Sequence, residues 1–216
     1  MFGRRLINTQ QGGGCTTDTL QILGDTSCVA TYRLNGDATD LSGNYNGTAT
    51  SVTYVAGQFG DAGSFNGSSS YIYATGLGIT GNVSFSVSIW IKTISSGLFF
   101  FFGDGSLYAS FYISVNANGT LTVGEFDYNL YTTTETVNDN NWHYVTFTSN
   151  GITSKLYIDG TETNSISNTF NISADRIELG RGSSSYYFNG SLDQVRIFNK
   201  AITAAEVTTL YNEVAC

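Results

Sequence analysis

Acidic and histidine side chains are the first residues to consider for catalysis. Glu125 and Asp127 lie two positions apart, so in a strand they would share one face. Hydrolysis of a glycosidic bond uses a pair of carboxyl groups that face a cleft. The paired-carboxylate motif requires a second catalytic Glu, and this stretch lacks it. We therefore interpret Glu125 and Asp127 as solvated edge residues. The only histidine, His143, lies in a strand-like segment and is better explained as a packed residue than as a base. We therefore predict no catalytic residues and no enzymatic activity.

Aromatic side chains in loops are the residues that could bind a sugar. Their ring faces stack on sugar C–H surfaces, while Asn, Asp and Tyr bond the hydroxyls. The candidates are Tyr128 and Tyr131 in one loop, and Tyr186 and Tyr187 after a run of three serines. Protein interfaces are also rich in aromatic residues, and core packing would use them too. We predict these four tyrosines as glycan or protein contacts and leave that choice open.

Composition and charge exclude several classes of function. Only 12% of the 216 residues are charged and the formal net charge is −8. Binding to a phosphate backbone needs clustered Lys and Arg, so we predict no nucleic-acid partner. The longest apolar run, residues 98–102, is far shorter than a membrane span, and the N-terminus lacks the apolar segment of a signal peptide.

The spacing of turn signals predicts many short strands. Asn-Gly and Asp-Gly pairs recur along the chain, and each is able to form a type I′ hairpin turn. Residues 83–92 alternate between apolar and polar types, which predicts a strand with one face on the core and one on a more polar surface. Thr203 and Glu206 form a capping box, which predicts a short helix that covers the sandwich. The fold class is all-β: a two-sheet antiparallel β-sandwich, or jelly roll, with one short C-terminal helix.

Six segments follow one another along the chain, and the capped helix comes after the last of them: residues 32–43, 57–71, 85–92, 141–145, 156–160 and 188–198. In this order they resemble the laminin-G-like (LamG-like jellyroll) domains of the concanavalin A-like lectin and glucanase superfamily, which have a helix at the same place. Gln194 departs from the pattern, since the family usually has an acidic residue there. The resemblance implies a non-enzymatic binding or structural module, with a free-standing carbohydrate-binding lectin as one form and a glycan-active enzyme as a minor alternative.

The same motifs suggest Asp37, Asp40 and Asp193 as metal ligands, because such domains often hold calcium at the rim of the sandwich. The alternative is that Asp37 and Asp40 form Asx turns and that Asp193 accepts bonds from local backbone N–H groups. Calcium is the one cofactor that we name, and both interpretations stay open.

The N-terminal segment is predicted to be separate from the sandwich, with residues 1–27 as an arm and 28–216 as the domain. The arm resembles the starts of structural proteins of marine tailed phages. This predicts a virion protein (head decoration, fibre or tail-associated) that is anchored to capsid or tail proteins through Arg4, Arg5, Leu6 and Ile7. We also expect a homo-oligomer that touches cell-surface glycans, with an extracellular location as the alternative. The pairing of Cys15, Cys28 and Cys216 is left open.

Overall fold

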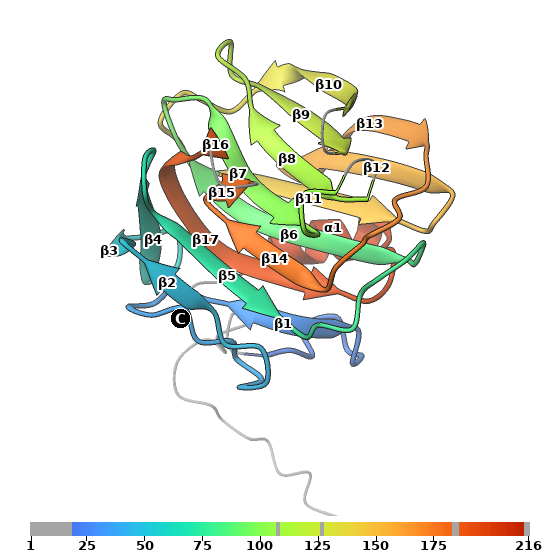
Figure 1. The fold of residues 1–216 in the computed structure, drawn as a ribbon, viewed down its shortest axis with the longest axis horizontal. Coiled ribbons are helices and arrows are strands. Elements are labelled where there is room, and N and C mark those ends of the chain that lie inside the picture. Colours follow the sequence, from blue (N-terminus) through green and yellow to red (C-terminus); the bar gives the residue numbers. More distant parts are fainter. Residues whose placement is uncertain (1–18, 107–108, 126–127, 183–185, 214–216) are drawn as a thin grey trace, which may run out of the picture.

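Two large antiparallel sheets pack face to face as a β-sandwich (Figure 1). The structure is a computed structural model that describes residues 19–106, 109–125, 128–182 and 186–213. It confirms the predicted all-β sandwich with one short C-terminal helix. The described residues hold no helix of the length and apolar character that a membrane crossing needs.

The eight-stranded sheet has the order β13-β12-β11-β6-β17-β4-β3, and β1 also pairs with β17. Its strands are β1 (Cys28–Tyr32), β3 (Thr53–Ala56), β4 (Asp61–Asn66), β6 (Phe85–Lys92), β11 (His143–Ser149), β12 (Thr153–Ile158), β13 (Thr161–Ser167) and β17 (Asn189–Phe198).

The seven-stranded sheet has the order β10-β9-β8-β7-β14-β5-β2. Its strands are β2 (Thr48–Thr50), β5 (Tyr71–Thr75), β7 (Gly97–Phe102), β8 (Phe111–Val115), β9 (Thr120–Glu125), β10 (Tyr128–Thr136) and β14 (Arg176–Leu179). A two-stranded hairpin, β15 (Arg181–Gly182) with β16 (Tyr186–Tyr187), follows β14.

The core lies between the two sheets and is rich in phenylalanine. Phe147 of the eight-stranded sheet meets Phe111 of the seven-stranded sheet with ring centroids 4.3 Å apart. Phe85 of β6 also contacts Phe111, at 5.4 Å. Burial of such large rings supplies most of the hydrophobic stabilisation of a small domain.

The outer face of the eight-stranded sheet is buried as well, because the predicted helix covers it. The alternation in residues 83–92 predicted a more polar surface on this face. The inward residues of β6 alternate as expected, but Ser86, Ser88 and Trp90 on its other face are also buried. Helix α1 (Ala204–Tyr211) and residues 20–23 cover them. Trp90 stacks on Tyr211, with ring centroids 5.8 Å apart. One of the two outer faces of the sandwich is therefore closed.

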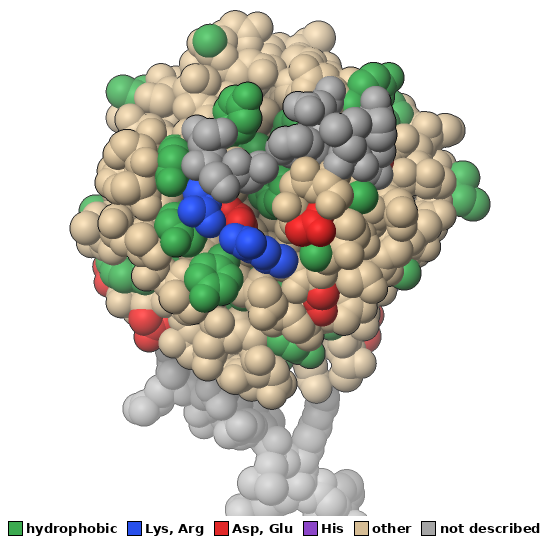
Figure 2. All heavy atoms as spheres, in the orientation of Figure 1, with side chains coloured by type: hydrophobic (Ala, Val, Ile, Leu, Met, Phe, Trp, Pro, Cys, Tyr) green, Lys and Arg blue, Asp and Glu red, His purple; other side chains and the backbone are tan. Residues whose placement is uncertain are grey.

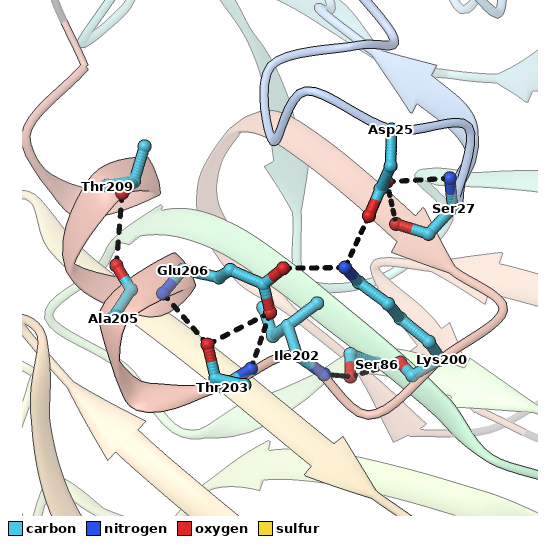
Figure 3. A network of polar contacts seen from close by, with 9 residues as sticks. All are labelled: Asp25, Ser27, Ser86, Lys200, Ile202, Thr203, Ala205, Glu206 and Thr209. Carbon is cyan, nitrogen blue, oxygen red and sulfur yellow. Dashed lines mark hydrogen bonds and ion pairs between the residues drawn. The ribbon is translucent and has the colours of Figure 1, made fainter.

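Helix α1 begins with the predicted capping box, and an ion-pair network ties it to the N-terminal segment (Figure 3). The Thr203 backbone N–H donates to Glu206 Oε2 at 2.7 Å. Lys200 Nζ lies 2.6 Å from both Glu206 Oε1 and Asp25 Oδ2. Residues 20–27 thus pack on the sandwich, and the part of the predicted arm that the structure describes is docked.

The predicted hairpins form, but most of their turns are not of the predicted type. A type I′ turn needs a positive φ at both central residues. Among the described Asn-Gly and Asp-Gly pairs, Asp159 (φ 51°) and Gly160 (φ 78°) satisfy this, between β12 and β13. Asn189 and Gly190 lie inside β17 and form no turn.

Candidate functional site

The outer face of the seven-stranded sheet is the open face of the sandwich. It is turned toward the viewer in Figures 1 and 2, and helix α1 lies behind it, on the far side of the other sheet. Figure 2 shows Lys or Arg side chains near the centre of this face, next to an acidic side chain and several hydrophobic ones. Further acidic side chains lie to the right of the basic pair and below it in Figure 2.

A groove of about 790 Å³ opens on this face, and we call it the sheet-face groove. A volume of this size falls within the range of small-ligand sites. The described residues that line it are Gly67, Ser96, Gly97, Leu98, Phe101, Tyr112, Ser114, Val115, Asn116, Ala117, Tyr128, Asn129, Gly182, Tyr186 and Tyr187. They come mainly from β7, β8, β10 and the β15–β16 hairpin. The groove thus combines aromatic rings with amide and hydroxyl groups.

Tyr112 crosses a neighbouring strand to reach the edge of the groove. Its register partner on β9 is Gly124, and Tyr112 Oη donates a short hydrogen bond to Asn129 Oδ1 of β10. A Cβ on Gly124 would lie 2.5 Å from Tyr112 Oη, so only glycine leaves room for this ring. The bond fixes the tyrosine and the amide next to each other in the groove lining.

Beside the groove lies a group that we call the arginine–tyrosine cluster: Tyr71, Tyr73, Arg176, Glu178 and Arg181. The Glu178 side chain is almost fully buried, and it pairs with both arginines, with Arg181 Nε at 2.7 Å and with Arg176 Nη2. Arg181 Cζ lies 3.5 Å from the centroid of the Tyr71 ring, and Arg176 Cζ lies 5.6 Å from that of Tyr73. Guanidinium groups over tyrosine rings are cation–π contacts.

The charges of this cluster hold each other in place. Burial alone would lower the pKa of Arg181, but its hydrogen bond with Glu178 and the charge of that carboxylate raise it. A hydrogen bond with Thr50 is the main reason that the pKa of Tyr71 is lowered, and the charge of Arg181 adds to this effect. The cluster is therefore a fixed pair of cations around one carboxylate.

Three of the four predicted contact tyrosines lie in the sheet-face groove. Tyr128 and Tyr186 are exposed and Tyr187 is half-buried. Tyr131 is placed elsewhere: it pairs with the core residue Val123 and packs in the core with only 9% of its surface exposed. Burial strongly raises the pKa of Tyr131. Its ring does not reach the surface as a sugar platform.

Comparison with known families fits this architecture. A family model described as the concanavalin A-like lectin/glucanases superfamily matches residues 66–208, about two thirds of the chain. The chain belongs to this superfamily. A comparison with curated protein sequences finds no match.

Solved structures with the same fold include binding domains of larger proteins. Domain 4 of AbnA, a GH43 extracellular arabinanase from Geobacillus stearothermophilus, in complex with arabinotriose, has a TM-score of 0.74 and 25% identity, over 86% of this chain and 98% of that domain. The binding domain of Paraclostridial Mosquitocidal Protein 1 gives 0.66 and 20%, over 86% and 52%. The botulinum neurotoxin serotype D ligand binding domain in complex with N-acetylneuraminic acid gives 0.63 and 18%, over 86% and 50%. This chain spans about half the length of the two toxin domains.

Glu125 and His143, two of the three residues considered for catalysis, lie outside the lining of the sheet-face groove. Glu125 of β9 is the strand-register partner of the core residue Phe111 of β8. Its side chain is buried, and this burial raises the pKa of Glu125. Asp127 lies outside the described residues. His143 is held between Asp159 Oδ2, 2.8 Å from Nδ1, and Asp139 Oδ1, 3.1 Å from Nε2. The hydrogen bond with Asp159 is the main cause that raises the pKa of His143.

The three aspartates predicted as calcium ligands accept hydrogen bonds from backbone N–H groups. Asp37 Oδ1 accepts from Thr39 at 2.8 Å, and buried Asp40 Oδ1 accepts from Thr31 at 2.8 Å. Asp193 Oδ2 accepts from Phe59 at 2.8 Å. In the described part of the chain, no group of three or more His, Cys, Asp or Glu side chains could hold a metal ion.

The predicted anchor Arg4, Arg5, Leu6 and Ile7 lies outside the described residues, as do Cys15 and Cys216. Cys28 is buried, with Sγ 3.5 Å from the Ala30 carbonyl oxygen, and burial raises the pKa of this thiol. The pairing of the three cysteines therefore stays open.

Sequence reasoning missed Tyr112 and the whole arginine–tyrosine cluster. The sequence held a signal for two pairs of residues, Tyr71 with Tyr73 and Arg176 with Glu178. The two members of each pair flank an apolar residue in a strand. This period of two places both members of a pair on the outer face. Nothing local shows that β5 and β14 are neighbours, so the two pairs could not be joined into one site.

Proposed function

We propose that this domain is a non-enzymatic carbohydrate-binding module that holds an oligosaccharide in the sheet-face groove. The observation that carries the proposal is the groove itself: tyrosine rings from β8, β10 and β16 surround one hollow on the uncovered face. Tyrosine presents a flat apolar face and a hydrogen-bonding hydroxyl, which suits a sugar ring. The likeness to AbnA domain 4, which was solved in complex with arabinotriose, supports this assignment.

The composition of the groove supports binding over hydrolysis. The described lining residues include no Asp or Glu. Glycoside hydrolysis ordinarily uses two carboxyl groups that flank the scissile bond. Glu178, the carboxylate of the adjacent cluster, is engaged by two arginines.

A glycan array with the purified chain, in the presence of calcium and again with chelator, tests this proposal. We expect a defined set of ligands, confirmed by calorimetry, and about tenfold weaker binding by the Tyr128→Ala/Tyr186→Ala double variant. Both side chains are exposed, so the variant should fold. Ile152→Ala is the matched control, because Ile152 is 71% exposed and lies outside the groove lining. No binding in either condition, or equal losses in variant and control, would overturn the proposal.

We propose the virion of a tailed bacteriophage as the setting of this module, with residues 1–27 as the attachment to capsid or tail proteins. Residues 20–23 pack on the closed face of the sandwich, opposite the groove. An attachment that precedes residue 19 would therefore leave the groove directed away from the particle, toward cell-surface glycans.

Deletion of residues 1–18 separates the virion setting from that of a free-standing lectin, because this deletion leaves the docked residues 20–27 in place. We expect the intact chain in purified particles, and the truncated chain absent from them but still able to bind glycan. Absence of the intact chain from particles would favour the free-standing lectin. Unchanged incorporation after truncation would overturn the anchor role of the arm.

A further inference from the structure

We infer that the ligand of the sheet-face groove is an acidic oligosaccharide, with a sugar carboxylate held by Arg176 and Arg181 at the end of the groove nearest β5. This inference rests on the proposed carbohydrate-binding function and names the chemical class of its ligand. The shared chemistry is a carboxylate on a sugar ring, as in uronic or sialic acids.

Strand register makes the groove and the arginine–tyrosine cluster one continuous surface. Phe101 of β7 pairs with Tyr112 of β8 on one side and with Glu178 of β14 on the other. Glu178 in turn pairs with Tyr73 of β5. Neighbouring strands are about 4.8 Å apart, so the row from Tyr112 to Tyr73 spans roughly 14 Å. A single sugar ring cannot cover this row, whereas an oligosaccharide can.

The cluster carries more positive than negative charge, on a chain whose formal net charge is −8. Arg176 and Arg181 share one carboxylate, that of Glu178. Other basic side chains are matched differently: Lys155 pairs with Glu162, and Lys200 pairs with both Asp25 and Glu206. An anionic group next to the cluster would therefore neutralise a charge that the described ion pairs leave in excess.

Arg176 is the arginine that is positioned to take a ligand. Its side chain is 38% exposed, against 13% for that of Arg181. One terminal nitrogen pairs with Glu178, and Nε is buried, so a ligand would have to bind at the terminal nitrogens. The guanidinium group is fixed by Glu178 and by the Tyr73 ring, so it loses little freedom when it binds. Its planar set of N–H donors matches the two oxygens of a carboxylate.

The experiment compares matched acidic and neutral ligands by calorimetry. One pair is trigalacturonate and its methyl ester, which lacks the negative charges, and the other is sialyllactose and lactose, which lacks the acidic sugar. The variants are Arg176→Gln and Arg176→Lys. Lys155→Gln is the control, because Lys155 is also an exposed strand residue with one carboxylate partner, on the other sheet.

We expect the wild-type protein to bind the acidic member of at least one pair about tenfold more tightly than the neutral member. The pair that shows the preference identifies the uronic or the sialic source. Arg176→Gln should abolish the preference with little change in neutral binding, Arg176→Lys should keep part of it, and Lys155→Gln should keep all of it.

Neutral ligands that bind as tightly as acidic ones would overturn the inference and leave the proposed function standing. A preference that survives Arg176→Gln would overturn the assignment of the carboxylate to Arg176. No binding to any of these ligands or to the glycan array would overturn both proposals together.

Discussion

Asp193 Oδ2 accepts a hydrogen bond from the backbone N–H of Phe59, 134 residues earlier in the chain, at 2.8 Å. The Asp193 side chain is fully buried beneath the closed face, and this burial raises its pKa to about 7 despite the backbone hydrogen bonds that lower it. The relationship ties the loop before β4 to the middle of β17, and it makes the stability of the fold depend on pH.

The free energy of unfolding should fall as pH rises from about 5 to about 6. In this range Asp193 is protonated in the folded chain but ionised in the unfolded chain, so the folded state binds more protons. One group contributes at most about 1.4 kcal/mol per pH unit. Asp25, Asp104 and Asp139 have pKa values lowered to about 2, so the stability that they contribute is complete above about pH 5 and is lost as pH falls below it.

Asp193→Asn, which keeps the shape of the side chain, should reduce the slope between about pH 5 and 6. Glu125 and Glu213, whose pKa values are also raised by burial, leave a residual slope of the same sign. Urea unfolding at several pH values measures it. His143 is unchanged in this variant, and its raised pKa makes stability fall at higher pH, as the proton is lost. An equal slope in wild type and variant would show that Asp193 is not the group responsible.

Arg196→Met should destabilise the fold by about 3–5 kcal/mol, because it leaves a buried carboxylate unpaired. Arg196 donates to both carboxylate oxygens of Glu213, and both side chains are fully buried. Burial raises the pKa of Glu213, and Arg196 opposes this rise.

Chemical denaturation of three variants checks this prediction. Arg196→Met/Glu213→Leu should cost much less than Arg196→Met alone, since no charge is left buried. Lys155→Met, which breaks the exposed pair with Glu162, should cost under about 1 kcal/mol. Equal costs for Arg196→Met and Lys155→Met would contradict a buried ion pair at the end of α1.

Thr203→Ala should lower the free energy of unfolding by about 1 kcal/mol, because the N-cap of α1 loses its side-chain acceptor. Thr203→Ser keeps the hydroxyl and should cost a few tenths of a kcal/mol at most. Thermal unfolding compares the two variants. The cap lies on the closed face, opposite the groove, so glycan binding should be unaffected in both variants. A parallel loss of glycan binding would contradict the separation of α1 from the groove.

Tyr131→Phe should leave glycan binding unchanged, whereas Tyr128→Ala should weaken it. Tyr131 is in the core and its hydroxyl has no hydrogen-bond partner among the described residues, so the phenylalanine fits without loss. Calorimetry with a ligand from the glycan array measures both. Weaker binding by Tyr131→Phe at unchanged stability would show that the ring contributes to a site after all.

Local patterns predict the fold well because each strand shows its period of two in its own residues. The alternation from Phe85 to Ile91 gives the inward face of β6 directly. The same pattern does not show what covers the other face, since Trp90 is buried by a helix that lies more than 100 residues later in the sequence. What covers a sheet is a property of the whole fold.

The candidate site was only partly predictable for the same reason. Tyr128, Tyr186 and Tyr187 stand out as aromatic residues near turns, and all three line the groove. Tyr131 follows Tyr128 by three positions, and an odd spacing in a strand places two residues on opposite faces. The row of Tyr112, Phe101, Glu178 and Tyr73 exists only because β8, β7, β14 and β5 are adjacent, which no local signal shows.

The most direct test of a glycan site on the open face is an NMR titration that follows backbone amides while an oligosaccharide from the array is added. We predict the largest changes in amide chemical shift at four residues that line the groove: Gly97, Asn116, Asn129 and Tyr187. The changes in α1 should be small. Shifts that cluster around Asp37 and Asp40, or on α1, with the groove residues unchanged, would contradict the account.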